Sequence, residues 1–444
     1  MRRGWFFSRW RIGARRSIAL AAIFLVSAVA LGPAFALQAP AEGGSGKLQS
    51  IQVTGSTRFK SDQIAEAMGL HVGAMITRDD LQKGANFLAQ LGPFISVEYR
   101  YGTSDAGVAA QYQVKDAPAV PVRFDNFPWF SDDELSATLK KSVVLFDGTA
   151  PEHGTILDSM ADALDTMLVA HGLHTGVSHA LTNAPFGNQQ VQEFHADNAP
   201  VTVKSIQFTD PLAQNDRGVQ SRIEDLVGKP YSRSAIELFE LEQVEPLYLS
   251  RSLLHVQFGP PTGKVSQSGG SSEIAVTASI DPGIAFTWNG VTWTGNAAIS
   301  SAELNIFVPF KTGDPADGMK IQAAWNAIHD DYTRSGYLDV NLVPAPQFDA
   351  NNKRVAYVVA LTEGPQYHMG QLILSGLSVE GERRIRGAWK IPQGGVLDES
   401  IYDEFFTSGI EQAFQGFPFH YEKIGHFLQK DPKTGTADVL IDFQ

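Results

Sequence analysis

A recurring segment is the feature that most constrains how this chain can fold. In residues 363–376, EGPQYHMGQLILSG, a turn signal at Glu363-Gly364-Pro365 precedes alternating polar and apolar residues, and Gly376 follows them. Period-two alternation predicts a half-buried strand, and the glycine after it predicts a turn. Residues 281–296, 116–126 and 48–56 share parts of this arrangement. We therefore interpret the chain as one structural unit used several times.

Glycines after the predicted long helices recur at a constant interval. Gly92 and Gly172 are 80 residues apart, Gly336 follows Gly172 by 164 residues, and Gly416 follows by another 80. A glycine adopts left-handed backbone geometry at low cost, so it can end a helix and turn the chain back into a sheet. Several agreeing intervals predict a repeat of about 80 residues, and a repeat decides the architecture.

Each repeat is predicted to contain a strand, two helices and a hairpin of two further strands. Three strands cannot cover their own apolar face, whereas two amphipathic helices can. The sequence therefore predicts an α+β chain: a tandem array of five β-α-α-β-β units, each a three-stranded mixed sheet covered by two helices. The expected boundaries are 1–36 (signal peptide), 37–47 (flexible linker), 48–117, 118–199, 200–282, 283–364 and 365–444.

The third repeat departs from the pattern because it has no closing glycine. Pro246 is expected to shorten or kink its second helix. Its hairpin is expected from residues 253–257 and 274–278, joined by an irregular tip over residues 262–272.

The first 36 residues have the pattern of an export signal. Six arginines and no acidic residue precede an apolar run over residues 18–31, and Ala34-Phe35-Ala36 supplies small residues for cleavage after Ala36. The run is short for a membrane-spanning helix. A retained inner-membrane anchor is the alternative, and Arg15-Arg16 also admits twin-arginine export.

Charge and composition exclude several classes of partner. The net charge is −13, and loss of the six N-terminal arginines would leave 29 basic residues against 48 acidic ones, a net charge of −19. An acidic surface repels phosphate backbones, so we expect no nucleic acid partner. The absence of cysteine excludes a disulfide framework and thiolate metal sites.

No motif predicts an enzyme, a metal or a cofactor. The histidines at 171, 174 and 179 fall on different predicted elements, which is poor spacing for a metal. The run GPPTGK over residues 259–264 misses the phosphate-loop spacing and is interpreted as a hairpin tip. Four neighbouring aromatic residues form either an exposed peptide-binding patch or, as packing statistics favour, core and inter-unit contacts: Phe124, Phe127, Trp129 and Phe130.

The turn-strand segments at 363–376 and 281–295 and the helix-closing pairs Gly336-Tyr337 and Gly416-Phe417 carry a resemblance. Over residues 48–444 the chain resembles a string of five POTRA domains, similar to the periplasmic arm of BamA-type outer-membrane assembly factors. In that family the arm leads into a C-terminal β-barrel. Here the sequence stops at Gln444, so we expect no barrel.

The resemblance implies that the second strand of each unit lies at a sheet edge, where a partner strand could pair with it. The alternative is that these edges are solvated or covered by the next unit. The candidate partner-binding residues are Val97, Tyr99, Val177, His255, Gln257, Val340, Leu342, Tyr421 and Lys423.

The function expected from this resemblance is that of a non-enzymatic periplasmic scaffold or chaperone-like protein in outer-membrane protein assembly or transport. Its expected partners are an outer-membrane β-barrel protein, unfolded outer-membrane clients, or other subunits of an assembly complex. Association with the outer membrane would then occur through a partner. A structural envelope protein of the division or secretion machinery, held by a retained N-terminal helix, is the alternative.

Overall fold

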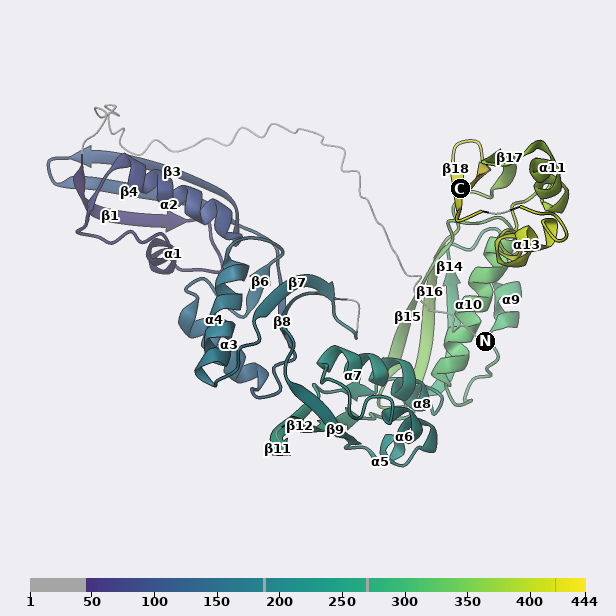
Figure 1. Cartoon of the computed structure of the whole chain (residues 1–444), viewed down its shortest axis with the longest axis horizontal. Helices are drawn as coiled ribbons and strands as arrows, with labels where there is room; N and C mark the ends of the chain where they lie inside the picture. Colours follow the sequence, from purple (N-terminus) through teal and green to yellow (C-terminus); the bar gives the residue numbers. More distant parts are fainter. Residues whose placement is uncertain (1–44, 187–188, 269–270, 420) are drawn as a thin grey trace.

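The computed structural model describes residues 45–186, 189–268, 271–419 and 421–444. Within them, β-sheets with associated helices follow one another along an arc, from β1 at one end to β17 and β18 at the other (Figure 1). The α+β class expected from the sequence is confirmed. The predicted export signal lies outside the described residues. None of the helices in the described residues is long and apolar enough to cross a membrane.

Five sheets in the described residues share one strand order, in which the last strand lies between the first strand and its own hairpin partner. Sheet 1 contains β1 (Gly46–Thr54), β2 (Met75–Ile76), β3 (Phe94–Ser104) and β4 (Gly107–Asp116). Sheet 2 contains β5 (Ala119–Asp125), β6 (Thr149–Pro151), β7 (Val177–Asn183) and β8 (Gln190–Ala196). Sheet 3 contains β9 (Val201–Phe208), β11 (Thr262–Ser268) and β12 (Ser271–Ala278). Sheet 4 contains β14 (Thr287–Thr294), β15 (Asn341–Asp349) and β16 (Arg354–Thr362). Sheet 5 contains β17 (His368–Ser375), β18 (Ile424–Asp431) and β19 (Thr436–Phe443).

Helices connect the first strand of each sheet to its hairpin. Those beside sheets 1 and 2 are α1 (Ser61–Ala67), α2 (Arg78–Leu91), α3 (Asp132–Ser142) and α4 (Ile156–Ala170). Those beside sheet 3 are α5 (Pro211–Gln214), α6 (Arg217–Ile223), α7 (Arg233–Phe239), the π-helix η1 (Glu240–Val244) and α8 (Glu245–Leu249). Those beside sheets 4 and 5 are α9 (Ser301–Leu304), the 3-10 helix η2 (Asn305–Phe307), α10 (Gly318–Arg334), α11 (Val379–Ala388), α12 (Glu399–Glu404), the π-helix η3 (Phe405–Gly409) and α13 (Ile410–Ala413).

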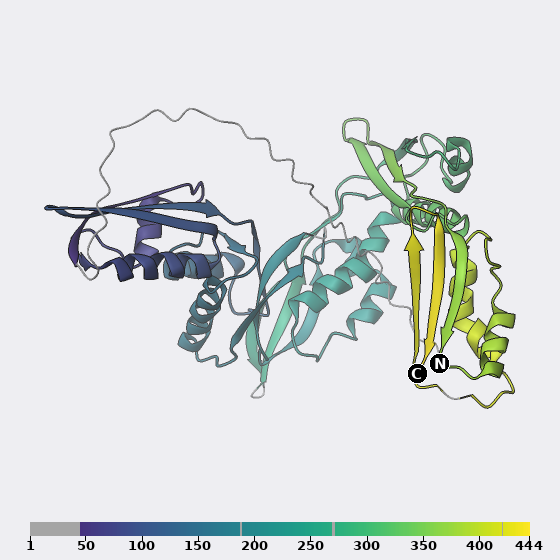
Figure 2. The same ribbon diagram turned by 90° about the horizontal axis from the view of Figure 1, so that it is seen from above.

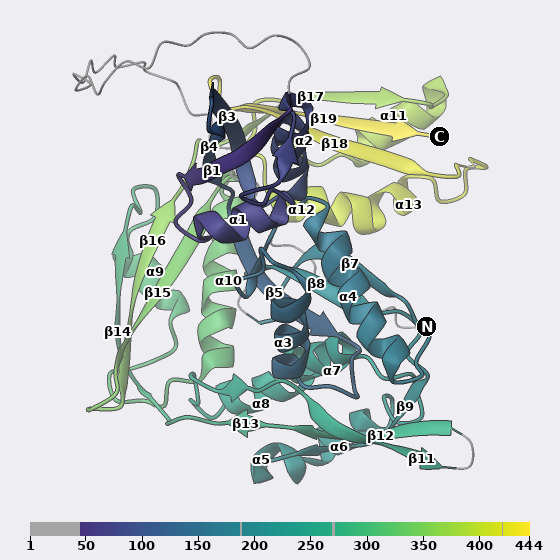
Figure 3. The ribbon, with the colours of Figure 1, turned by 90° about the vertical axis from the view of Figure 1, so that its left-hand side faces the viewer.

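Each sheet is mixed. The first strand pairs in parallel with the central strand, and the hairpin partner pairs with it antiparallel. In β4 the burial alternates residue by residue, so one face is covered and the other is open to solvent. Figure 2 shows the helices of sheet 5 on one face of its strands, and Figure 3 shows that the sheets face different directions along the arc.

Sheets 1 and 2 differ from the expected three strands because the segment between their two helices also pairs with the first strand. It forms β2 against β1 and β6 against β5, which gives four strands. In sheets 3, 4 and 5 the same segment makes an isolated bridge, at Pro230, Pro315 and Val396. The pairing therefore recurs in every sheet, and only its length varies.

In the expected hairpin of the third repeat, the first strand is wrong, whereas the second, residues 274–278, lies in β12. Residues 262–268, taken as part of the tip, form β11 and pair with β12. Residues 253–256 lie outside the strands, and Gln257 and Phe258 form the short strand β10, which pairs with β13 (Ile280–Asp281). The sequence TGKVSQS of β11 has a single large apolar residue, so it lacks the alternation that predicts a strand.

Three of the glycines after first strands are required by close approach of the backbone. Gly55, Gly295 and Gly376 all have positive φ. A Cβ added there would lie 2.0, 2.2 and 1.8 Å from a carbonyl oxygen of the central strand. In sheet 2 the corresponding residue is Asn126, with a φ of 61°, and asparagine is one of the few other residues that adopts this conformation.

The closing position of the third repeat is occupied by Ser252, which lies 80 residues after Gly172 and has a φ of 64°. The backbone turns identically at both places: the N–H of Leu173 donates to Leu168 O, and that of Leu253 donates to Tyr248 O. The repeat is therefore regular in backbone conformation where it is irregular in residue type.

The buried side chains form one core that continues from sheet 1 into sheet 2, and separate cores at sheets 3, 4 and 5. Trp129 contacts both the first core and that of sheet 3. The first two sheets are consequently the most continuously packed pair.

Candidate functional site

The edge strands are the first candidate site. The strands β3, β7, β11, β15 and β18 each occupy the end of the strand order and pair with one neighbour. The expectation that the second strand of each repeat lies at an edge therefore holds in sheets 1, 2, 4 and 5, whereas in sheet 3 the edge strand is β11 and not the predicted segment. Whether these edges bind a partner is a separate question, and their local chemistry differs.

In sheets 1 and 2 the predicted residues lie on the edge. Val97 and Tyr99 belong to β3, and Val177 begins β7. Tyr99 stacks on Tyr112 of the neighbouring β4, with ring centroids 5.5 Å apart, and its hydroxyl donates to Gln82 of α2. The side chain of Tyr99 therefore contributes to the helix-sheet contact, and its backbone is the part that remains at the edge.

In sheet 3 the predicted residues do not lie on the edge strand. His255 lies before β10 and contacts two rings, Phe286 at 5.0 Å and Phe348 at 3.8 Å between centroids. Gln257 pairs with Asp281 in the two-stranded β10–β13 sheet. Both residues thus belong to the connection between sheets 3 and 4, and β11 takes the place that was predicted for them.

In sheets 4 and 5 the predicted residues lie at or before the start of the edge strand. Val340 precedes β15, Leu342 is its second residue, and both side chains are buried. Tyr421 and Lys423 precede β18. The N–H of Lys423 donates to Gln444 O, so the backbone there already has a partner.

Two prolines distinguish β15 from the other edges. Pro344 and Pro346 lie two residues apart, so they occupy the same side of the strand's hydrogen-bonding pattern. Proline on an edge strand places its missing N–H on the solvent side. The outer side of β15 therefore lacks two successive donors, which is a known way of blocking strand addition.

A cluster of buried charges between sheets 2 and 3 is a second candidate site, and the sequence analysis missed it. Arg233 at the start of α7 donates to Asp132 (2.8 Å), to Glu237 (2.8 Å) and to the carbonyl of Phe124. Arg123 of β5 pairs with both Glu193 and Glu237. The i, i+4 spacing of Arg233 and Glu237 was visible in the sequence, but the partners on sheet 2 lie more than 100 residues away.

Asp125 is the centre of this cluster. It is 3% exposed and accepts from Ser234 N–H (3.1 Å), Ser234 Oγ (3.0 Å) and His195 Nδ1 (3.1 Å). Burial alone would raise the pKa of Asp125, but the hydrogen bonds from His195 and Ser234 outweigh burial and hold it below the usual value. The hydrogen bond to Asp125 in turn raises the pKa of His195.

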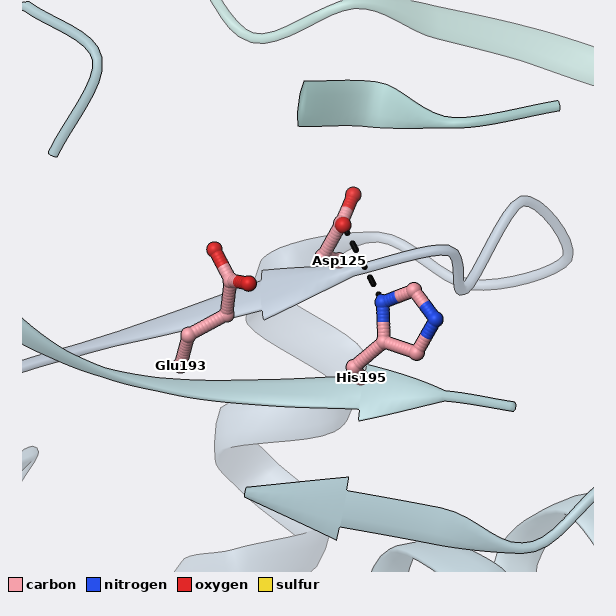
Figure 4. A group of neighbouring side chains, drawn as sticks. All are labelled: Asp125, Glu193 and His195. Carbon is pink, nitrogen blue, oxygen red and sulfur yellow. Dashed lines mark hydrogen bonds and ion pairs between the residues drawn. The ribbon is translucent and has the colours of Figure 1, made fainter. Parts of the chain in front are cut away.

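Figure 4 shows that Glu193 and His195 project from the same face of β8, with Asp125 of β5 beside them. Their potential ligand atoms lie within 4.8 Å of one another, the only such trio in the described residues. Carboxylates and imidazole suit zinc. However, Arg123 already neutralises Glu193, and Asp125 is satisfied by Ser234 and His195. The trio is therefore better explained as part of the ionic contact.

The three histidines considered in the sequence do not form such a group. His171 Nδ1 bonds to Met167 O, and His179 lies 3.2 Å from Asp158. The four neighbouring aromatic residues differ in burial. Phe124 and Phe127 are buried, whereas Trp129 and Phe130 are half-buried. The last two lie beside a groove of about 520 Å³ between sheets 2 and 3. The run over 259–264 also lines this groove, and its last three residues belong to β11.

The chain folds into successive α+β units with mixed sheets, and part of it is similar to known proteins. Residues 286–364, which contain sheet 4, match the POTRA family model, described as a surface antigen variable number repeat. This match covers sheet 4 and the helices beside it. It is 22% identical over 169 residues to a putative outer membrane protein assembly factor of Treponema pallidum (strain Nichols), an alignment covering 38% of this chain and 19% of that protein.

Solved structures of POTRA domains are also similar. The POTRA3-5 segment of BamA from Haemophilus influenzae is 17% identical, with a TM-score of 0.42, over 55% of this chain and 96% of that one. The POTRA1-3 segment of Omp85 from Anabaena is 13% identical, with a TM-score of 0.23, over 55% of this chain and 94% of that one.

Proposed function

We propose that this chain is a non-enzymatic periplasmic scaffold of five POTRA-like domains, bounded as the repeat predicts, and that it holds polypeptides during outer-membrane protein assembly. The POTRA match and the similarity to an assembly factor support this class of function. Export through cleavage after Ala36 and residence in the periplasm are parts of the same proposal. Its partners are outer-membrane proteins, their unfolded precursors, or further assembly subunits.

The observation that carries the proposal is the edge strand present in every sheet. Backbone N–H and C=O groups on an unpaired edge can bind an extended segment largely regardless of its sequence. We assign this role to β3, β7, β11 and β18. We exclude β15, because its prolines remove donors and its Phe348 contacts His255 of the preceding connection.

The expected affinity suits transient holding. Four backbone hydrogen bonds at about 1 kcal/mol each correspond to a dissociation constant near 1 mM for one edge. Several edges on one chain could raise the affinity by roughly 100-fold if one client spans them. A protein that must release its client benefits from contacts that are weak individually.

Site-specific photo-crosslinking in cells tests the proposal. Probes at Val97, Leu181, Ser266 and Phe427 sample the four edges, and a probe at Ala345 on β15 is the matched control. We expect adducts with outer-membrane proteins or their precursors at the first four positions and few at Ala345. Equal labelling at all five, or no adducts from a folded protein, would contradict binding through the edges.

A further inference from the structure

A groove between sheets 2 and 3 has the form of a side-chain receptor. This joint groove has a volume of about 520 Å³, within the range of small-ligand pockets, and is lined by residues 127–134, 260–263, Phe124, Tyr231, Arg233 and Ile274. Tyr231 and Ile274 are buried beneath it, and Trp129 and Phe130 are half-buried at its wall. Aromatic walls of this kind favour an apolar or aromatic occupant.

The joint groove adjoins an edge strand. Thr262 and Gly263, which line it, are the first residues of β11. In the described residues β11 pairs with β12 alone. Alternate side chains of a strand added to β11 would point toward the face that carries Ile274, which is the side of the groove. Backbone pairing and side-chain insertion are therefore compatible in one extended segment.

Three acidic residues lie at the rim of the groove: Asp132, Asp133 and Glu134. Asp132 is paired with Arg233, whose charge is also shared with Glu237. Asp133 and Glu134 are exposed, and Glu134 accepts hydrogen bonds from Ser131, which together with the nearby His171 lower the pKa of Glu134. A bound segment would gain from a lysine or arginine at this rim.

We propose that the joint groove receives an aromatic side chain from an extended polypeptide segment paired with β11, and that Asp133 and Glu134 select a basic residue on the same face of that segment. This inference rests on the proposed edge binding and adds a sequence preference to it. On one face of a strand, the basic residue would lie two positions from the aromatic one.

Fluorescence anisotropy with residues 45–444 of the chain and labelled heptapeptides tests this preference. The probe is an alternating threonine peptide with tryptophan at its centre and lysine two residues to either side. We expect replacement of the tryptophan by alanine to weaken binding about tenfold or more, because a buried aromatic surface is lost. Replacement of both lysines by glutamate should weaken it about threefold or more at low salt.

Variants of the protein locate the site. Asp133→Lys should weaken binding of the lysine peptide and strengthen that of the glutamate peptide. Asp62→Lys is the matched control, since Asp62 is also an exposed acid in the first turn of a helix and lies in sheet 1's helix α1. Phe130→Ala should reduce discrimination between tryptophan and alanine peptides, with circular dichroism verifying that the variant is folded.

Two results would overturn the inference in different ways. Equal binding of the tryptophan and alanine peptides, with loss of both on backbone N-methylation, would reject the groove and leave edge binding intact. Equal effects of Asp133→Lys and Asp62→Lys would show that only overall charge matters. If no peptide binds at 2 mM, the groove preference fails, and the crosslinking experiment decides the proposed function independently.

Discussion

At the scale of the residue, the repeat is maintained by backbone conformation more than by residue identity. Ser252 adopts the positive φ that glycine supplies at the corresponding position of the other repeats, and Asn126 does so after β5. Both positions break a sequence pattern without breaking the structural one. The free-energy cost of the left-handed backbone conformation at such a residue can be measured by substituting glycine for it.

Ser252→Gly should stabilise the region around α8, and Gly172→Ser should destabilise the end of α4. A left-handed conformation costs a residue other than glycine roughly 1–2 kcal/mol, and the greater freedom of glycine in the unfolded chain offsets about 0.5–1 kcal/mol of this. An added Cβ at Gly172 meets no atom within 4 Å, so that variant isolates the conformational term. Hydrogen exchange of the two helices measures both effects, and a loss of protection in both variants would contradict the prediction.

Glu240 should make the free energy of unfolding depend on pH. Its side chain is fully buried in η1, and neither carboxylate oxygen has a hydrogen-bond partner among the described residues. Burial, with a smaller contribution from Glu237 and opposed by Arg233, raises its pKa from 4.5 to about 8. Between these values the folded state keeps a proton that the unfolded state loses, so stability falls as pH rises.

The expected slope is up to about 1.4 kcal/mol per pH unit between pH 5 and pH 8. Glu240→Gln should remove this slope. At pH 8, α7 should then be better protected from hydrogen exchange in this variant than in the wild-type protein. Glu242→Gln, at an exposed position two residues further on, should have neither effect. Hydrogen exchange of α7 and η1 at pH 6 and pH 8, corrected for intrinsic rates, measures this. An unchanged pH dependence in Glu240→Gln would show that the carboxylate is ionised in the folded protein.

At the scale of the element, the sequence predicts the helices and strands that have a clear capping residue or a clear alternation of polar and apolar residues. The helix α2 begins after Thr77, whose hydroxyl accepts from Asp80 N–H, and β17 follows the alternation seen in residues 366–375. The edge strand β11 was missed because its polar sequence packs few side chains. The ionic contact between sheets 2 and 3 was missed because Asp125 and Ser234 are 109 residues apart, and pairing over that distance depends on how the domains meet.

The edge β15 should become able to bind extended peptides when its prolines are replaced. The double variant Pro344→Val, Pro346→Val restores two N–H donors on the outer side of the strand and keeps side chains that favour strands. We expect a photo-crosslinker at Ala345 to gain adducts. Ala345→Val, with a probe at Gln347, is the control because it alters strand propensity without adding donors. Failure of the double variant to gain adducts would show that the contact of Phe348 with His255 is enough to cover this edge.

At the scale of the whole molecule, consecutive sheets are joined by contacts of different chemistry. Sheets 2 and 3 share the buried ions, and sheets 3 and 4 share ring contacts around His255. Between sheets 4 and 5, Tyr367 donates to Asp339 (2.6 Å). Each joint thus has its own sensitivity to pH, salt or packing, and the arc in Figure 1 depends on all of them.

The joint between sheets 1 and 2 depends on two glycines in direct contact. A Cβ on Gly154 would lie 2.4 Å from Leu91 O and 2.5 Å from Gly92 Cα, so alanine there must push the two sheets apart. Gly148→Ala is the matched control, because Gly148 also has positive φ (107°) but an added Cβ meets no atom within 4 Å. Both variants carry similar backbone strain of roughly 1–2 kcal/mol, and they differ only in the contact.

Spin labels on introduced cysteines at Asp105 and Lys141 can report the distance between sheets 1 and 2 without background, since the chain has no cysteine. We expect Gly154→Ala to shift or broaden the distance distribution and Gly148→Ala to leave it unchanged. The buried core that continues across this joint opposes a complete separation, so the displacement should be a reorientation with both sheets folded. Identical distributions in the two variants would mean that the shared core, and not the glycine contact, sets the angle at this joint.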